Sequence, residues 1–169
     1  IVVILFCFAY QGAQKLPLPR LTLKKMLLFL SIGTNLGYRE ANIHHALRLL
    51  DAKVGTQLAC SSFYRSEPQG FISDNEFVNI VVAYETDYTL EELLLLTQQI
   101  ERDLGRTQKS VNGIYHDRII DIDLLLAKDG DCFLEHNSPT LTIPHPRMHE
   151  RDFVTIPLQE VKHILSSTL

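Results

Sequence analysis

Two carboxylates separated by one residue, Asp121 and Asp123, form the most chemically suggestive pattern in the chain. In an extended strand, side chains two residues apart point to the same face, so these carboxylates share one space while Ile122 turns to the other face. Adjacent acids in a partly buried strand repel each other unless a cation neutralises them, and hard oxygen ligands suit Mg²⁺ better than Zn²⁺. The alternative is that both acids are solvated on an exposed sheet face, and the pair alone does not decide between the two interpretations.

Two arginines near this pair favour chemistry on a phosphate. Arg118 lies three residues before Asp121, and Arg106 begins the loop that leads to the same strand. A guanidinium group can donate two parallel hydrogen bonds to a phosphate, and magnesium surrounded by such groups recurs in phosphoryl transfer. Taken alone, an arginine at either position is more often a surface charge. The combination predicts magnesium-assisted phosphoryl-type transfer from a nucleotide.

A third candidate group follows near the end of the chain. His145 lies between two prolines in a stiff segment, where its ring can either donate to a phosphate or cap a turn. Arg151 and Phe153 lie two residues apart, so in an extended chain they face the same way. Such a pair combines an anion clamp with a flat apolar surface.

The elements that must position these groups follow from the periodicity of apolar residues. Alternating or continuous apolar runs predict strands at 26–32, 54–64, 77–86 and 119–126. Apolar residues recurring every three or four positions predict helices at about 38–51 and 89–104. Thr89 and Glu92 form a capping box at the start of the second helix, and Gly105 can end it. The order is strand, helix, strand, strand, helix, strand.

This order predicts an α+β, ferredoxin-like fold, in which the two helices pack on one face of an antiparallel sheet. A short C-terminal extension follows, with a Pro-bounded segment at 140–146 and a short helical piece at about 148–151. Turn-forming residues make 67–75 a loop. Residues 106–118 have no apolar period and predict a long mobile loop.

Length and composition predict one soluble globular domain. The chain has 169 residues, of which 46% are hydrophobic and 21% charged. A formal net charge of -4 provides no overall field for a polyanion, so no nucleic-acid partner is expected. Three cysteines without C-x-x-C spacing suggest neither a disulfide framework nor a zinc site. They point to a reducing compartment, and we expect the protein in the cytoplasm.

The first 25 residues differ from the rest of the chain. An apolar run at 1–10 precedes its basic residues, whereas a secretory signal has its positive region first. Ten apolar residues also fall short of the ~20 that span a bilayer, so no membrane association is expected. Because the chain lacks an initial Met and Met26 directly precedes the first strand, we expect residues 1–25 to be an upstream extension or a disordered leader. Residues 26–169 would then be the functional domain.

Several motifs in order along the chain carry a family resemblance. They are Ser31-Ile-Gly-Thr-Asn-Leu36, Ser61-Ser-Phe-Tyr-Arg65, Phe77-Val-Asn79, Arg118-x-x-Asp-x-Asp123, and Thr142-Ile-Pro-His145 through Arg151-Asp-Phe153. From about residue 28 to residue 158 the chain resembles the 6-hydroxymethyl-7,8-dihydropterin pyrophosphokinases of folate biosynthesis. It departs from that family in having Tyr115-His116-Asp117 where a Trp and a Gly often precede the second arginine.

The resemblance implies transfer of the pyrophosphoryl group of ATP to the hydroxymethyl oxygen of the pterin, with release of AMP. It implies that Asp121 and Asp123 bind two Mg²⁺ ions and that Arg106 and Arg118 assist the transfer. The residues implied to bind the pterin are Ser66, Pro68, Phe77, Asn79 and Phe153, and those implied to bind ATP are Gln98, Glu101, Leu124, Thr142, His145 and Arg151. The two small molecules are the expected partners of a monomeric enzyme.

Two alternatives remain at this point. A ferredoxin-like fold also hosts ligand-binding and RNA-binding modules, and fold alone does not fix function. An Asp-x-Asp pair also serves other metal-dependent transferases. If the family function holds, the loops at 66–75 and 106–118 are expected to close over the substrates, because both are polar and flank the site.

Overall fold

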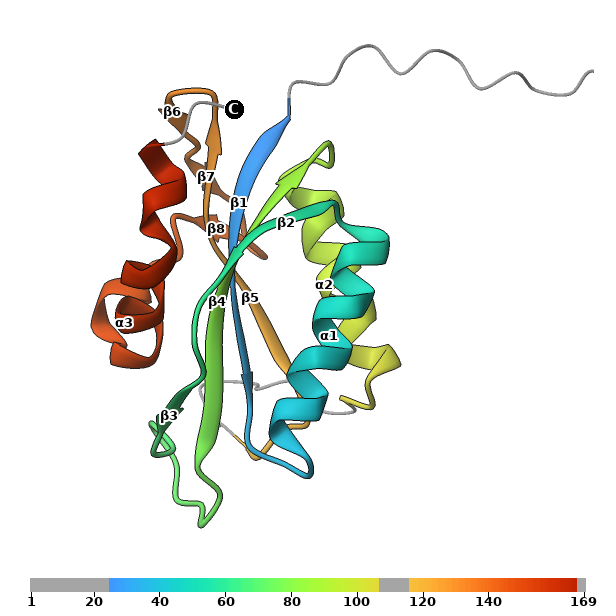
Figure 1. Ribbon diagram of the computed structural model, residues 1–169, viewed down its shortest axis with the longest axis vertical. Coiled ribbons are helices and arrows are strands. Elements are labelled where there is room, and N and C mark those ends of the chain that lie inside the picture. Colours follow the sequence, from blue (N-terminus) through green and yellow to red (C-terminus); the bar gives the residue numbers. More distant parts are fainter. Residues whose placement is uncertain (1–24, 107–115, 167–169) are drawn as a thin grey trace, which may run out of the picture.

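The computed structural model describes residues 25–106 and 116–166, and its centre is a six-stranded antiparallel sheet (Figure 1). The strand order is β2-β4-β1-β5-β6, and β3 pairs with β4 beside β2. The strands of the sheet are β1 (Met26–Thr34), β2 (Thr56–Cys60), β3 (Tyr64–Ser66), β4 (Phe77–Thr86), β5 (Asp121–Asp129) and β6 (Cys132–Phe133). A separate pair joins β7 (His136–Asn137) to β8 (Thr142–Ile143).

Helices cover both faces of this sheet (Figure 1). Helices α1 (Arg39–Lys53) and α2 (Leu90–Asp103) lie on one face, and α3 (Asp152–Val161) lies on the other. Short 3-10 turns, η1 (Met148–Glu150) and η2 (Lys162–Ser166), flank α3. Among the described helices, none has the length and apolar content needed to cross a membrane.

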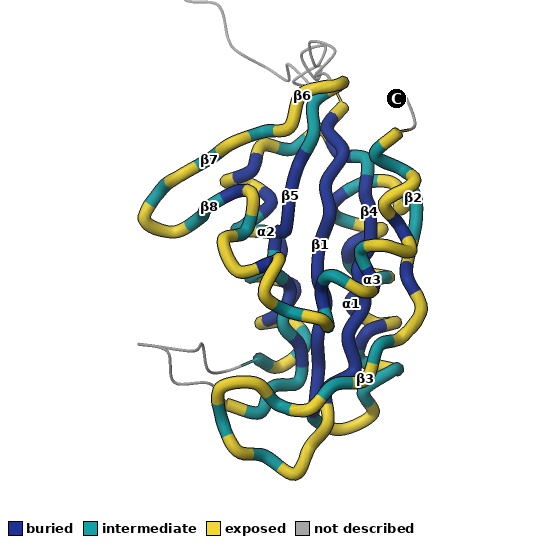
Figure 2. Tube along the Cα trace, turned by 90° about the vertical axis from the view of Figure 1, so that its left-hand side faces the viewer, coloured by how far each residue is buried: buried dark blue, intermediate teal, exposed yellow. Residues whose placement is uncertain are grey.

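The two-residue period of the strands builds two hydrophobic clusters, one on each face. Alternate residues of β1, β4 and β5 pack against α1 and α2, and the intervening residues of β1 and β4 pack against α3. Figure 2 shows the consequence: the central strands are buried along almost their whole length. A strand covered on both faces reads as a continuous apolar run, as residues 26–30 do in β1.

The predicted fold class is confirmed, and the strand at 77–86 has the predicted bounds. The capping box is also present: the Thr89 hydroxyl accepts from the Glu92 amide, and the Glu92 carboxylate accepts from the Thr89 amide. Gly105 follows α2 with a φ of 95°, a conformation that favours glycine. The fourth strand begins at Asp121 and not at Ile119, so the first metal-ligand candidate is its first residue.

The prediction of a single strand at 54–64 is wrong. The structure has two short strands there, because Cys60 pairs with Val82 while Tyr64 pairs with Asn79, which leaves one extra residue on this side. Ser61 satisfies the ladder at the break: its amide donates to the Val81 carbonyl, and its hydroxyl accepts from the Val81 amide. As a result, β3 pairs with the start of β4, and β2 pairs with the later part of the same strand.

The C-terminal extension is larger than predicted. Instead of a short helical piece at 148–151, the chain forms η1 and then the ten-residue helix α3. Pro157 lies inside α3, although proline disfavours helix interiors. Burial of Val154, Pro157 and Val161 against the sheet explains why the helix continues.

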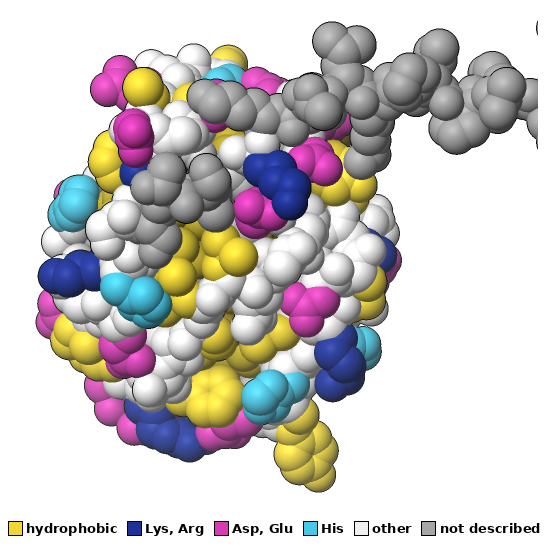
Figure 3. Space-filling model, turned by 45° about the horizontal axis from the view of Figure 1, so that its top comes forward, with side chains coloured by type: hydrophobic (Ala, Val, Ile, Leu, Met, Phe, Trp, Pro, Cys, Tyr) yellow, Lys and Arg dark blue, Asp and Glu magenta, His cyan; other side chains and the backbone are white. Residues whose placement is uncertain are grey.

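The surface mixes charges of both signs. Figure 3 views the molecule with its top turned forward, and on the described part of that face Lys and Arg side chains lie among Asp and Glu side chains. This face presents no continuous basic surface in the part of the chain that is drawn in colour.

Candidate active site

Strand register places the key polar residues in one row across the sheet. Gly33 of β1 pairs with Asn79 of β4 on one side and with Asp121 of β5 on the other. Ser31 pairs with Asp123 two residues further along. All these residues lie on the face that α3 covers, because they alternate with residues of the α1 and α2 cluster. An amide and two carboxylates thus meet where β1 ends and β4 and β5 begin.

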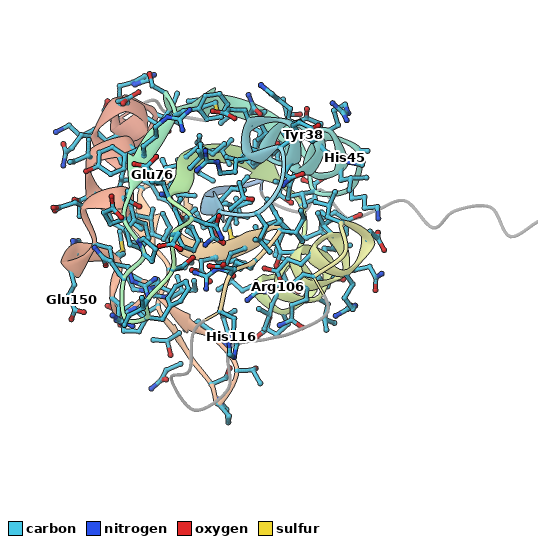
Figure 4. The ribbon with its side chains drawn as sticks, turned by 90° about the horizontal axis from the view of Figure 1, so that it is seen from below. Tyr38, His45, Glu76, Arg106, His116 and Glu150 are labelled. Carbon is cyan, nitrogen blue, oxygen red and sulfur yellow. The ribbon has the colours of Figure 1, made fainter. Side chains whose placement is uncertain are left out.

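A pocket opens over this row. Figure 4 views this end of the molecule from below, with Glu150 of η1 at the left edge and Arg106, which follows α2, nearer the middle. Strands, the loop at 67–76 and the start of α3 all contribute walls. The pocket is lined by Ser31, Gly33, Ser66, Glu67, Gln69, Phe71, Phe77, Asn79, Arg118, Asp121, Asp123, Arg147, Arg151 and Phe153.

In this pocket, an arginine guanidinium group lies over each of two phenylalanine rings. The Arg118 guanidinium lies 5.1 Å from the centre of the Phe77 ring, and that of Arg151 lies 5.6 Å from the Phe153 ring. Phe71 meets Phe77 edge-on, with ring centres 6.3 Å apart. Arg151 is extended but Phe153 lies in the first turn of α3, so the two still face one another without the extended chain that the sequence suggested. Flat surfaces and cations therefore line the same pocket.

Asn79 is buried at 3% exposure, and its amide is held in place from several sides. Its Nδ2 atom donates to the Ser66 hydroxyl at 3.0 Å and lies 3.4 Å from the Tyr64 carbonyl. A Cβ atom on Gly33 would lie 2.7 Å from Asn79 Oδ1, so the amide or the strand would have to shift to admit a side chain there. The glycine therefore leaves the space that the amide occupies.

We predict that Gly33→Ala displaces the Asn79 amide, because the added methyl group claims the position of Oδ1. Binding of any ligand that hydrogen-bonds this amide should weaken by about tenfold, the size of one lost hydrogen bond in a buried site. Calorimetric titration into the variant of the hydroxymethyl pterin that the sequence resemblance implies would measure the change. Unchanged affinity in Gly33→Ala would show that the amide position does not matter.

The two carboxylates have unequal surroundings. Asp121 is paired with both Arg106 and Arg118, the latter at 3.0 Å between Nη2 and Oδ2. Asp123 pairs with Arg151 at a longer distance, 3.8 Å between Oδ2 and Nη1. Desolvation, and next repulsion from the Asp121 carboxylate, raise the pKa of Asp123, while Arg151 and Arg118 act in the opposite direction. Negative charge at Asp123 is therefore poorly compensated by the protein.

A divalent cation would fit this pair. Among the described residues, no three His, Cys, Asp or Glu side chains cluster as a complete metal site. Mg²⁺ is often held by only one or two carboxylates, with substrate phosphates and water supplying the remaining ligands. Asp121 and Asp123 match that donor set, and an ion there would offset the repulsion at Asp123.

Glu101 lies behind the strand and not in the pocket. The residue is 5% exposed, and its carboxylate accepts from the Ile122 amide at 2.8 Å and from Arg106 at 2.6 Å. Burial raises its pKa, in spite of the neighbouring Arg106 guanidinium. Glu101 thus fixes Arg106 against the start of β5.

A second cavity adjoins the first at Asp123, which lines both. His145 lies in it with its Nδ1 atom accepting from the Arg147 amide at 3.2 Å. The neutral ring therefore carries its proton on Nε2, which can donate to a ligand. Burial, with Arg151 and Arg147 nearby, lowers the pKa of His145 and favours this neutral form. The ring thus caps a turn and keeps a donor for a ligand, so both interpretations of His145 remain compatible.

The structure brings most of the predicted site residues together. Eight line the first pocket, namely Ser66, Phe77, Asn79, Arg118, Asp121, Asp123, Arg151 and Phe153, and three line the second, namely Leu124, Thr142 and His145. Arg106 reaches the site through its ion pair with Asp121. Pro68, Gln98 and Glu101 line neither cavity. The loop predicted at 106–118 lies largely at 107–115, outside the described residues.

Sequence reasoning missed six residues that line the first pocket. They are Ser31, Gly33, Glu67, Gln69, Phe71 and Arg147. Ser31 and Gly33 could have been found from an assumed pairing of the first and fourth strands. The other four depend on how loops and the segment before α3 fold over the sheet, which no local pattern indicates.

Comparison with known proteins adds an independent line of evidence. Residues 29–163 match the family described as "7,8-dihydro-6-hydroxymethylpterin-pyrophosphokinase (HPPK)". A protein of Porphyromonas gingivalis named 2-amino-4-hydroxy-6-hydroxymethyldihydropteridine pyrophosphokinase is 47% identical over 135 residues, covering 80% of this chain and 90% of its own. A Bacillus subtilis protein of the same name is 38% identical over 136 residues, covering 80% of this chain and 77% of its own.

One solved structure supports the fold. It is titled "Crystal Structure Analysis of the HPPK-DHPS in complex with substrates" and superimposes with a TM-score of 0.57 over 81% of this chain. The identity is 13%, so the likeness bears on the fold alone. The chain spans 40% of the length of that protein.

Proposed function

This chain belongs to the HPPK family, pyrophosphokinases of folate biosynthesis, and on that premise we propose that it transfers the pyrophosphoryl group of ATP to 6-hydroxymethyl-7,8-dihydropterin. The observation that carries the proposal is the row of Asn79, Gly33 and Asp121 across three strands. It puts a buried amide beside a carboxylate pair, in a pocket that three aromatic side chains, Phe71, Phe77 and Phe153, also line. Family membership decides against both alternatives, a binding module without catalysis and an unrelated Asp-x-Asp transferase.

The first pocket suits a pterin. A pterin is a flat heterocycle whose edge carries hydrogen-bond donors and acceptors. Phe77 and Phe153 offer apolar faces for the ring, and the Asn79 amide can both donate to and accept from the edge. Ser66 helps to orient that amide, as the 3.0 Å bond between them indicates. We propose that Pro68, in the loop that follows Ser66, also contributes to binding the pterin. The hydroxymethyl group would then point toward the carboxylate pair.

The second cavity suits the nucleotide. Leu124 and Thr142 line it, and His145 supplies a donor from Nε2. Asp123 lies at the junction of the two cavities, where the phosphate chain must cross. The proposed nucleotide set is completed by Gln98, Glu101 and Arg151, with Glu101 acting from behind the strand through Arg106.

We propose that Asp121 and Asp123 hold two Mg²⁺ ions together with the ATP phosphates. Bound there, the ions supply charge neutralisation and alignment of the phosphate chain. Arg106 and Arg118 are paired with Asp121 in this structure. An ion at Asp121 would compete with both guanidinium groups for this carboxylate, which would make Arg118 available to phosphate oxygens and leave Arg106 anchored by Glu101 beside them.

The reaction then consists of one displacement. The hydroxymethyl oxygen of the pterin forms a bond to the β-phosphorus, and the bond from that phosphorus to the oxygen bridging the α-phosphate breaks. That oxygen leaves on AMP, and the hydroxyl proton passes to solvent. The protein contributes position and charge stabilisation, which account for most catalysis of this type. We further propose that the protein acts as a cytoplasmic monomer.

A product assay tests this function. Purified protein should form AMP from ATP only when the hydroxymethyl pterin and Mg²⁺ are both present, because the pterin oxygen is the acceptor and the ions align the phosphates. Chromatographic separation of AMP and ADP, with EDTA and no-pterin controls, measures this. ADP formation, or AMP formed without the pterin, would overturn the proposal.

A further inference from the structure

Asp117 links three separate segments beside the site, although its position in the sequence suggested only a departure from the family pattern. Its Oδ1 atom accepts from Asn35 Nδ2 at 2.6 Å, and its Oδ2 atom accepts from Asn75 Nδ2 at 2.7 Å. Asn35 follows β1, Asn75 lies in the loop before β4, and Asp117 lies just before Arg118. We refer to Asn35, Asn75 and Asp117 as the Asp117 clamp.

Asn35 connects the clamp directly to Arg118. It is 2% exposed, and its side-chain Oδ1 atom accepts from the backbone amide of Arg118 at 2.8 Å. Its backbone amide donates to the Arg118 carbonyl at 3.1 Å. Its Nδ2 atom also lies 3.3 Å from the Asn75 carbonyl. The backbone of Arg118 is therefore fixed relative to β1, and the 67–76 loop is fixed to the same point.

The residues held by the clamp line the first pocket. Arg118 stacks over Phe77 and pairs with Asp121, while the loop tied by Asn75 contributes Gln69 and Phe71 to the pocket wall. Phe71 in turn meets Phe77 edge-on. A shift of either segment would therefore move a wall of the pocket.

We propose that Asp117 is a positioning residue, which couples the 67–76 loop to Arg118 and so sets the pterin-facing walls of the pocket. Its partners named above belong neither to the carboxylate pair nor to the row of Asn79, Gly33 and Asp121. Hydrogen bonds from Ser73, Asn75 and Asn35 lower the pKa of Asp117, as expected for a carboxylate that is used as an acceptor. The choice of the pterin as the ligand rests on the proposed function. The contacts that couple the loop to Arg118 do not depend on it.

An exchange of side chains tests the clamp. In Asp117→Asn, one of the two acceptor oxygens becomes an NH₂ group that faces the NH₂ group of Asn75, so the bond from Asn75 is lost. Adding Asn75→Asp restores it, because the new amide at position 117 can then accept from Asn35 and donate to the new carboxylate at position 75. Asp74→Asn is the matched control, since it removes the same charge from an exposed neighbour in the loop.

The KM for the pterin should rise about tenfold in Asp117→Asn, while the KM for ATP stays within about threefold. Hydrogen exchange in the ligand-free 67–76 loop should accelerate, with an unchanged Tm. The double variant should return both the pterin KM and the exchange rate to near wild type, and Asp74→Asn should change neither. Wild-type exchange and pterin KM in Asp117→Asn, or a double variant no better than the single, would overturn the proposal. If the wild type does not use the pterin, the proposed function fails, while the exchange data still decide on the clamp.

Discussion

Replacing Asp123 by Asn should lower turnover by about a thousandfold or more, with no loss of folded stability. The carboxylate is the one acid of the pair that lies at the junction of both cavities and that has only a distant counter-ion. An amide of the same shape cannot neutralise a divalent ion, so the phosphate chain loses its alignment. The same change removes the repulsion between Asp123 and Asp121, so the Tm should stay the same or rise.

Steady-state kinetics and thermal unfolding of the purified variant would measure these two effects. Asp131→Asn is a suitable control, because that acid follows the same strand but its side chain is 93% exposed. Turnover within about threefold of the wild type would contradict a role for Asp123 in binding the ion. A lower Tm with partial unfolding would indicate instead that the acid is a structural element of β5.

Replacing Asn79 by Leu should raise the KM for the pterin about a hundredfold and leave the KM for ATP nearly unchanged. Leucine has a similar shape but neither donates nor accepts, so the polar edge of the pterin would be buried without partners, at about 1–3 kcal/mol for each such group. The protein itself loses only the bonds from this amide to Ser66 and Tyr64. Initial-rate measurements with each substrate varied in turn separate the two KM values.

Ser66→Ala provides a graded comparison for this second prediction. It removes the hydroxyl that orients the amide but leaves the amide itself, so the KM for the pterin should rise only severalfold. An equal loss in both variants would point to a general disturbance of β3 and β4. A KM for ATP that rises as much as that for the pterin would contradict the assignment of the first pocket to the pterin.

Local patterns predicted the features that depend on neighbours in the chain. The period of two placed both carboxylates on one face of β5, and Ile122 and Leu124 do turn to the α1 and α2 cluster. The capping box located the start of α2. These predictions succeed because strand alternation and helix capping are set within a few residues.

Tertiary packing decided what the sequence could not. The cover on the second face of the sheet comes from α3, whose length depends on burial against β4 and not on helix propensity. The need for glycine at position 33 appears only when β1 and β4 are in register, which brings Asn79 against it. Asp117 gains its partners from segments 82 and 42 residues away, so no local motif could assign it a role.

Phosphorus NMR of the pterin product tests the central claim most directly. If the pyrophosphoryl group of ATP moves as one unit, the pterin product should carry two coupled phosphorus atoms, and the nucleotide product should be AMP in equal amount. A pterin with a single phosphorus atom, accompanied by ADP, would contradict attack at the β-phosphorus and the function proposed for this site.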